Sequence, residues 1–179
     1  MFTRSARPSL RGTLTAVICL LVAFSAAAHA ATPGELVAGK RSQGASFAAV
    51  SPFGGFTKAG GELGSVLRNG TLMSLDAKAL GAVRRERPET ISLALPTFAS
   101  GPVVLDLVRV DLFAPGFSAV SASGAAIPAK ALGDHYRGVV RGDDESMAAI
   151  SFFDGEIAGF ATSPRVGCLL YTSPSPRDS

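Results

Sequence analysis

The sequence has few residues of the kinds that build disulfide frameworks and metal sites. Its two cysteines, Cys19 and Cys168, lie near opposite ends of the chain, so the long segment between them has neither a disulfide framework nor a thiolate metal ligand. Its two histidines, His29 and His135, are too far apart to form the zinc-binding His-Glu-x-x-His motif on one helix. There is no tryptophan, and this weakens the case for a carbohydrate-binding surface built from exposed aromatic rings.

The central part of the chain also lacks net charge. The whole sequence has a net charge of +3 and a pI near 9.2. Residues 31–167, however, contain 13 basic and 13 acidic side chains, so the excess comes from the two ends. The basic pI is therefore no indication of a nucleic-acid or anionic membrane partner, and we expect no nucleic-acid partner.

Residues 1–30 have the pattern of a signal peptide. The basic residues are Arg4, Arg7 and Arg11, and the apolar core is Leu14 to Phe24. Ala28 and Ala30 form a small-x-small cleavage site, which predicts a mature chain that begins at Ala31. An uncleaved anchor is the alternative, but the apolar core is short for a bilayer span. We expect a secreted or periplasmic protein with no stable membrane insertion after cleavage.

The C-terminal run from Cys168 to Asp178 matches, residue for residue, the translation of one reading frame of a transposase-type sequencing adaptor. We therefore interpret residues 168–179 as an artefactual tail and expect the natural protein to continue beyond Gly167. A natural Pro/Ser-rich tail is the alternative. The expected organisation is a signal peptide (1–30), a Gly/Ala-rich leading segment (31–64), an incomplete β-rich domain (65–167) and the tail.

The leading segment 31–64 has no clear helical or strand period, and its many glycines make ordering costly. We expect it to be loosely ordered, with one strand around residues 45–50. Asn69-Gly70 then separates two short β-prone runs, residues 66–68 and 71–73. This pattern predicts a hairpin with a two-residue turn.

One short helix is predicted from Ala77 to Arg87. Asp76 is a good N-cap, and the apolar residues Ala77, Leu80 and Val83 recur at helical spacing. The basic cluster 84–87 lies in the last turn, where positive charge complements the helix dipole. We prefer this interpretation to a basic processing site, because cleavage there would split the domain.

The rest of the chain alternates short β-prone runs with turn residues. The runs are Ile91 to Leu95, Val103 to Phe113, Phe117 to Val120, Tyr136 to Val140 and Met147 to Phe153, with a polar turn at 142–145. Asp154-Gly155 predicts a hairpin with a type I′ turn. Asp106 and Asp111 cannot share one strand face, so a bulge or an exposed edge is expected. The predicted fold is mainly β, a single antiparallel sandwich or open-barrel-like domain.

Two clusters could suggest chemistry at His135. Asp134 and His135 are adjacent, and adjacent strand residues point to opposite faces, so they cannot form a hydrolase triad with a serine. His135 could be a ligand toward another domain, but an ordinary surface histidine is the favoured interpretation. We predict no catalytic, cofactor-binding or metal-binding residue in this chain.

Two further patterns fall in the turn that begins at Arg141. Asp143-Asp144-Glu145 could offer oxygen ligands to calcium, yet these residues are consecutive rather than spaced to surround an ion. A solvated turn is the favoured interpretation. Arg141-Gly142-Asp143 spells an integrin-binding tripeptide, but a match over three residues readily arises by chance.

From Tyr136 onward the chain reads Tyr-x-Gly-x-Val-x-Gly-Asp-x-x-Ser-x-x-Ala-Ile-Ser, followed by a short hairpin. The pattern residues are Tyr136, Gly138, Gly142, Asp143, Ser146, Ser151, Gly155 and Gly159. This block resembles the prosegment of secreted reprolysin-type (adamalysin-like) zinc metalloproteases. The order of helix, Leu-x-Leu-Pro strand and Ala-Pro-Gly-Phe turn extends the resemblance to about residues 72–160.

The resemblance implies a zymogen prosegment that assists folding of its own downstream protease domain and inhibits it. The zinc would lie in that missing domain, and this chain would hold no cofactor. Many such prosegments block the zinc with a cysteine, and none is present between Ala31 and Gly167. Either that cysteine lies further on, or inhibition is steric. The alternative function is an exported β-sandwich module for adhesion or carbohydrate binding, without catalysis.

Overall fold

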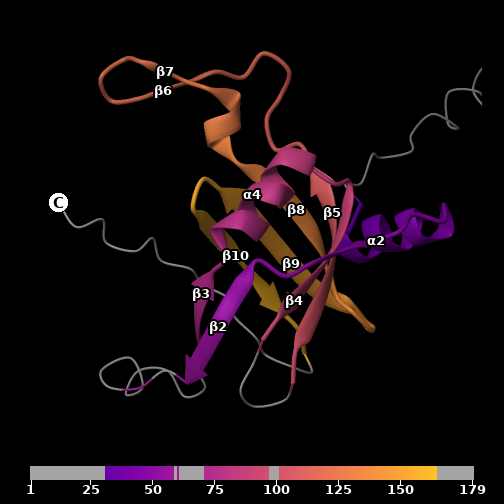
Figure 1. Cartoon of the computed structure of the whole chain (residues 1–179). Helices are drawn as coiled ribbons and strands as arrows, with labels where there is room; N and C mark the ends of the chain where they lie inside the picture. Colours follow the sequence, from indigo (N-terminus) through magenta and orange to yellow (C-terminus); the bar gives the residue numbers. More distant parts are fainter. Residues whose placement is uncertain (1–30, 59, 61–70, 97–100, 165–179) are drawn as a thin grey trace, which may run out of the picture. The chain divides into compact units, whose positions relative to one another are not determined.

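The computed structural model describes residues 31–58, 60, 71–96 and 101–164 (Figure 1). The helices within them are α2 (Pro33–Ser42), α4 (Ala77–Glu86) and the 3₁₀ helix η1 (Ala129–Leu132). The strands are β1 (Ala48–Val50), β2 (Phe53–Lys58), β3 (Thr71–Leu75), β4 (Thr90–Leu95), β5 (Val103–Val110), β6 (Ala119–Val120), β7 (Ala126–Ile127), β8 (Asp134–Val140), β9 (Asp143–Phe153) and β10 (Glu156–Thr162). The prediction of a mainly β fold is confirmed.

Six strands form the main sheet, in the order β1-β4-β5-β8-β9-β10. The sheet is open, and β2-β3 and β6-β7 form separate two-stranded sheets. Every neighbouring pair of the main sheet is antiparallel except β1 and β4, which are parallel. The parallel pair was not predicted; it is possible because the β2-β3 hairpin and α4 together form the long crossover that parallel strands require.

The prediction of a single helix and a loosely ordered leading segment is wrong, because α2 occupies residues 33–42. Thr32 and Glu35 form a complete capping box, and Pro33 opens the first turn. Only Val37 of this helix is buried, so its apolar stripe is too narrow to show as a period. The sequence signal for this helix is therefore its start, Thr32 to Glu35, and not its periodicity.

The prediction for α4 is confirmed to within one residue. The Asp76 carboxylate accepts hydrogen bonds from the Lys78 and Ala79 amides at 2.9 and 3.0 Å. Leu80 and Val83 are buried. The helix ends where Arg87 adopts a left-handed backbone, with φ of 46°.

The two α-helices pack on opposite faces of the main sheet. Neighbouring residues Leu107 and Val108 of β5 point to opposite faces. Leu107 belongs to the large core cluster that contains Leu80 of α4, and Val108 packs with Val37 of α2. In Figure 1, α4 crosses the face of the sheet toward the viewer, and α2 lies beside β5. The sheet is therefore buried on both sides of β5.

The prediction of a bulge or exposed edge in the Val103 to Phe113 run is wrong. β5 pairs with β4 and with β8 in uninterrupted register, so it is an internal strand. It ends at Val110, and Asp111 lies beyond it. Asp106 is accommodated within the sheet because it has partners of opposite charge, described below.

The predicted turns within the described residues lie near the expected positions, but their type and length differ from the prediction. Asp154 and Gly155 form the two-residue turn between β9 and β10, yet only Gly155 has positive φ (77°), so the turn is not type I′. The polar turn predicted at 142–145 is shorter, because β9 already begins at Asp143. The predicted Asn69-Gly70 turn lies outside the described residues, and β3 pairs with β2.

Candidate functional site

The residues of the prosegment-like pattern form the framework of β8, β9 and β10. Tyr136 is 1% exposed, its hydroxyl donates to the Pro88 carbonyl at 2.9 Å, and its ring packs edge-on against Phe152. Burial, with help from the nearby Asp134 carboxylate, raises the pKa of Tyr136 to about 12. Tyr136 therefore stays neutral and ties β8 to the turn that follows α4.

Two glycines of the pattern allow neighbouring strands to approach closely. A Cβ at Gly138 would lie 1.9 Å from the Asp106 carbonyl oxygen on β5. A Cβ at Gly159 would lie 2.2 Å from the Ala149 carbonyl oxygen on β9. No other residue fits at either place without moving the backbone. The remaining pattern glycines, Gly142 and Gly155, lie in turns with positive φ.

Asp143 and Ser146 close the turn between β8 and β9. The Ser146 hydroxyl accepts from the Val140 amide at 2.6 Å and donates to the Asp143 carbonyl. The buried Asp143 carboxylate accepts from the Ser163 hydroxyl. Asp143 thus faces inward, so the Arg141-Gly142-Asp143 tripeptide does not present its carboxylate to a receptor. No cluster of three or more potential metal ligands occurs within the described residues.

A buried ionic network joins both helix α2 and the β8-β9 turn to the main sheet. Asp106, 3% exposed, accepts hydrogen bonds from Arg141 at 2.7 and 3.1 Å, from Arg41 at 2.6 Å and from Ser92 at 2.6 Å. Burial alone would raise the pKa of Asp106, but the bonds from Arg141, Ser92 and Arg41 together lower it. We interpret this network as structural, because both oxygens of the Asp106 carboxylate already accept hydrogen bonds from the protein.

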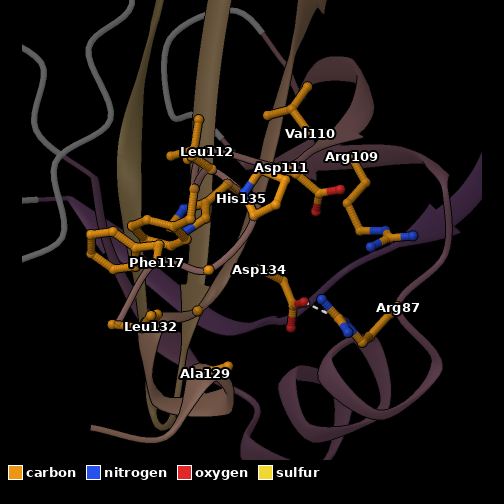
Figure 2. Close-up of a pocket in the computed structure, with 15 residues that line it drawn as sticks. Arg87, Arg109, Val110, Asp111, Leu112, Phe117, Ala129, Leu132, Asp134 and His135 are labelled. Atoms are coloured by element: carbon orange, nitrogen blue, oxygen red, sulfur yellow. Dashed lines mark hydrogen bonds and ion pairs between the residues drawn. The ribbon is translucent and has the colours of Figure 1, made fainter. Parts of the chain in front are cut away.

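A cleft of about 390 Å³ lies where β5 ends and β8 begins (Figure 2). One side carries charged groups, Arg87, Arg109 and Asp134, and the other carries rings, including Phe117 and His135. The segment after β5 and the residues around η1 complete the walls. The cleft is thus formed by chain segments that meet at one end of the sheet.

The charged side of the cleft contains one arginine whose side chain has no hydrogen-bond or ion-pair partner among the described residues. The Arg87 Nε donates to the Asp134 carboxylate at 2.5 Å, and Arg84 approaches the same carboxylate at 4.0 Å. Arg109 is half-buried, and its buried Nε has no acceptor within the described residues. Asp111 also lines the cleft but makes no ion pair with Arg109 there.

The aromatic side of the cleft is built around His135. The rings of Phe113 and Phe117 stack with centroids 4.6 Å apart, and Phe113 meets His135 edge-on at 5.7 Å. The His135 Nδ1 is 2.8 Å from the Ser151 hydroxyl, and its buried Nε2 has no partner in the described part of the chain. His135 is thus half-buried rather than an ordinary surface residue.

The Ser151 and His135 pair does not extend to a triad. Asp134 is bound to Arg87 on the other face of the sheet, as the alternation of strand side chains requires. No carboxylate within the described residues therefore orients the imidazole ring of His135.

The predicted cleavage residues are only partly described. Ala28 and Ala30 lie outside the described residues, which begin at Ala31. None of the helices in the described ranges is both long enough and apolar enough to cross a bilayer.

These features define a mainly β domain with an open mixed sheet, one α-helix on each face and a cleft at one end. No protein-family model, curated protein or solved structure matches the chain. The resemblance to a protease prosegment therefore depends on the sequence pattern alone. Sequence reasoning missed Arg109 and the ring pair Phe113 and Phe117 as site residues, although an arginine within an apolar strand was a visible signal.

Proposed function

We propose that this chain is the prosegment of a secreted zinc metalloprotease made as a zymogen. In this role it assists folding of its own downstream protease domain and covers the active-site cleft of that domain until it is removed. The zinc ion belongs to the protease domain, and this chain contributes no cofactor and no catalytic residue. The predicted signal peptide fits this role, because such zymogens are exported.

One observation carries the proposal: the pattern residues hold strands together rather than forming a reactive site. Tyr136 anchors β8 to the α4 turn, Gly138 and Gly159 let neighbouring strands approach, and Ser146 closes the β8-β9 turn. A motif of this kind suits a domain whose function is to present a surface. It gives no support to an independent enzyme within this segment.

Steric cover is the mode of inhibition that this chain can supply by itself. It holds no cysteine between Ala31 and Gly167 that could bind a zinc ion as a thiolate. A cysteine further along the natural protein would add direct zinc binding to steric cover.

An inhibition assay tests the proposal. The purified chain is titrated into a reprolysin-type metalloprotease that cleaves a fluorogenic peptide, and we expect saturable inhibition at a one-to-one ratio. The control is Gly138→Ala, whose Cβ would collide with the Asp106 carbonyl and strongly destabilise the sheet. Inhibition that survives in this variant reflects competition by an unfolded chain as a substrate. Absence of inhibition by the wild-type chain contradicts the proposal and favours the adhesion module.

A further inference from the structure

Arg109 is the half-buried arginine without a carboxylate partner among the described residues; the Arg84 Nε is also without a hydrogen bond, but Arg84 has ion-pair partners in Asp134 and Asp154. Each arginine in the following group has a carboxylate partner: Arg41, Arg84, Arg85, Arg87 and Arg141. Arg137, which has none, is exposed, so water can solvate its guanidinium group. Arg109 is half-buried, and its Nε is buried without an acceptor in the described part of the chain. A buried charged donor of this kind needs an acceptor.

The acidic groups near Arg109 are already committed or lie apart from it. Asp134 is bound by Arg87. Glu89 is bound by Lys40, and Arg109 acts on it only through its charge, as the smallest of the causes that lower the pKa of Glu89. Asp111 lines the same cleft, but no hydrogen bond or ion pair joins it to Arg109 in the described residues. Figure 2 shows the Arg109 side chain on the charged side of the cleft, which Arg87, Asp111 and Asp134 also line. The guanidinium group is thus available to an external acceptor.

The opposite side of the cleft offers an apolar surface. Phe117 is 52% exposed and Phe113 is 40% exposed, and their rings stack on one another. Leu112 beside them is also exposed. Exposed apolar side chains that line a concave surface are typical of ligand sites, which combine such walls with a few polar groups.

We propose that this cleft binds a carboxylate that is attached to an apolar or aromatic group. The carboxylate pairs with the Arg109 guanidinium, whose fork geometry matches two carboxylate oxygens. The apolar group packs against Phe113 and Phe117. A volume of about 390 Å³ suits a small aromatic acid or the last residue of a peptide. The site is independent of the proposed inhibitory function, because no protease takes part in this binding.

Calorimetric titration of the whole chain tests the site. The probes are 3-phenylpropionate and its uncharged amide, and we expect saturable binding of the acid that is about tenfold or more tighter than binding of the amide. Equal binding of the two probes overturns the proposal, since it shows that Arg109 takes no carboxylate. Two acetylated peptides that end in Phe, one with a free carboxyl end and one amidated, identify the source of the carboxylate. Tighter binding of the free-ended peptide than of 3-phenylpropionate indicates a peptide terminus, and tighter binding of 3-phenylpropionate indicates a free small acid.

Variants locate the binding. Arg109→Gln should weaken binding of 3-phenylpropionate about tenfold or more, and the matched control Arg137→Gln, at an exposed arginine, should leave it unchanged. Unchanged binding in Arg109→Gln overturns the proposal. If that variant fails to fold, Phe117→Ser provides a second test at an exposed position. This change should weaken the binding of 3-phenylpropionate but not the binding of acetate, which has no ring. Asp111→Asn should tighten binding of 3-phenylpropionate by removing a negative charge from the cleft that lies around Arg109. Unchanged or weaker binding in this variant would contradict a carboxylate site at Arg109.

Discussion

At the scale of single residues, the fold depends on a few positions where the surroundings accept only one kind of side chain. Asp106 is a carboxylate within an internal strand, and four donor groups from Arg41, Ser92 and Arg141 satisfy it. Gly138 stands beside it on the next strand and leaves room for the Asp106 carbonyl. Both residues were visible in the sequence. Their importance was not, because it depends on partners elsewhere in the chain: Ser92 is 14 residues from Asp106, and Arg141 and Arg41 are 35 and 65 residues from it.

Replacing Asp106 with Asn should destabilise the protein by about 2–3 kcal/mol at neutral pH, because two arginines lose their buried counter-charge. The folded-state pKa of Asp106 is lowered, so its contribution is fully present above the unfolded value near 3.9 and is lost as the pH falls through the folded value. The gap in unfolding free energy between wild type and Asp106→Asn should therefore shrink when urea unfolding is measured at about pH 3 rather than pH 7. A gap that is constant with pH would contradict the role of the charge.

Gly138→Ala should destabilise the protein by about 4 kcal/mol or more, because the new Cβ would lie 1.9 Å from a backbone oxygen. The matched control is Gly39→Ala within α2, where a Cβ meets nothing within 4 Å. That change should stabilise the protein by about 0.5–1 kcal/mol through helix propensity and the unfolded state. Thermal unfolding of both variants by circular dichroism gives the comparison, and similar melting temperatures would show that β5 and β8 can separate at little cost.

At the scale of elements, the sequence predicted what local signals encode. Asp76 and the apolar spacing predicted α4, and Asp154-Gly155 predicted the β9-β10 hairpin. The helix α2 carried its signal in Thr32 and Glu35, but its narrow apolar stripe gave no period. The parallel pairing of β1 with β4 and the meeting of Arg109 with Phe117 in one cleft depend on contacts between distant segments. A pattern within one segment cannot predict these contacts.

The capping box predicts how α2 responds to mutation. Thr32→Ala should destabilise the first turn of α2 by about 1 kcal/mol, because the Glu35 amide loses its acceptor. Amide hydrogen exchange should accelerate in α2 and remain unchanged in α4, whose cap is Asp76. Acceleration in both helices would mean that the effect is global, and the local role of the cap would then be wrong.

At the scale of the whole molecule, the two edges of the main sheet differ. One edge is β1, which has three residues, and the other is β10, which has seven. Within the described residues β10 pairs only with β9, and its register there is uninterrupted. Its only charged residue is Glu156 at the start, and it contains no proline. Natural edges are usually protected by charge, proline or bulges, so this edge favours pairing with another strand.

The β10 edge predicts concentration-dependent association of this chain. The Phe153 and Glu156 pair closes a two-residue hairpin, so the backbone groups of Ile157, Gly159 and Ala161 point away from β9. Two antiparallel copies centred on Gly159 would pair these groups with one another, and Glu156 would lie opposite Thr162 of the second copy rather than opposite another charge. Sedimentation velocity should therefore show a dimer that weakens in Phe160→Lys, which adds charge to this edge.

The matched control for this association is Val120→Lys, since Val120 is 67% exposed and lies on β6, outside the main sheet. It should leave the dimer unchanged, because a lysine there adds the same charge without touching β10. Equal loss of association in both variants would show that net charge alone is responsible. A wild-type chain that sediments as a monomer at all concentrations and melts cooperatively would contradict association through the β10 edge.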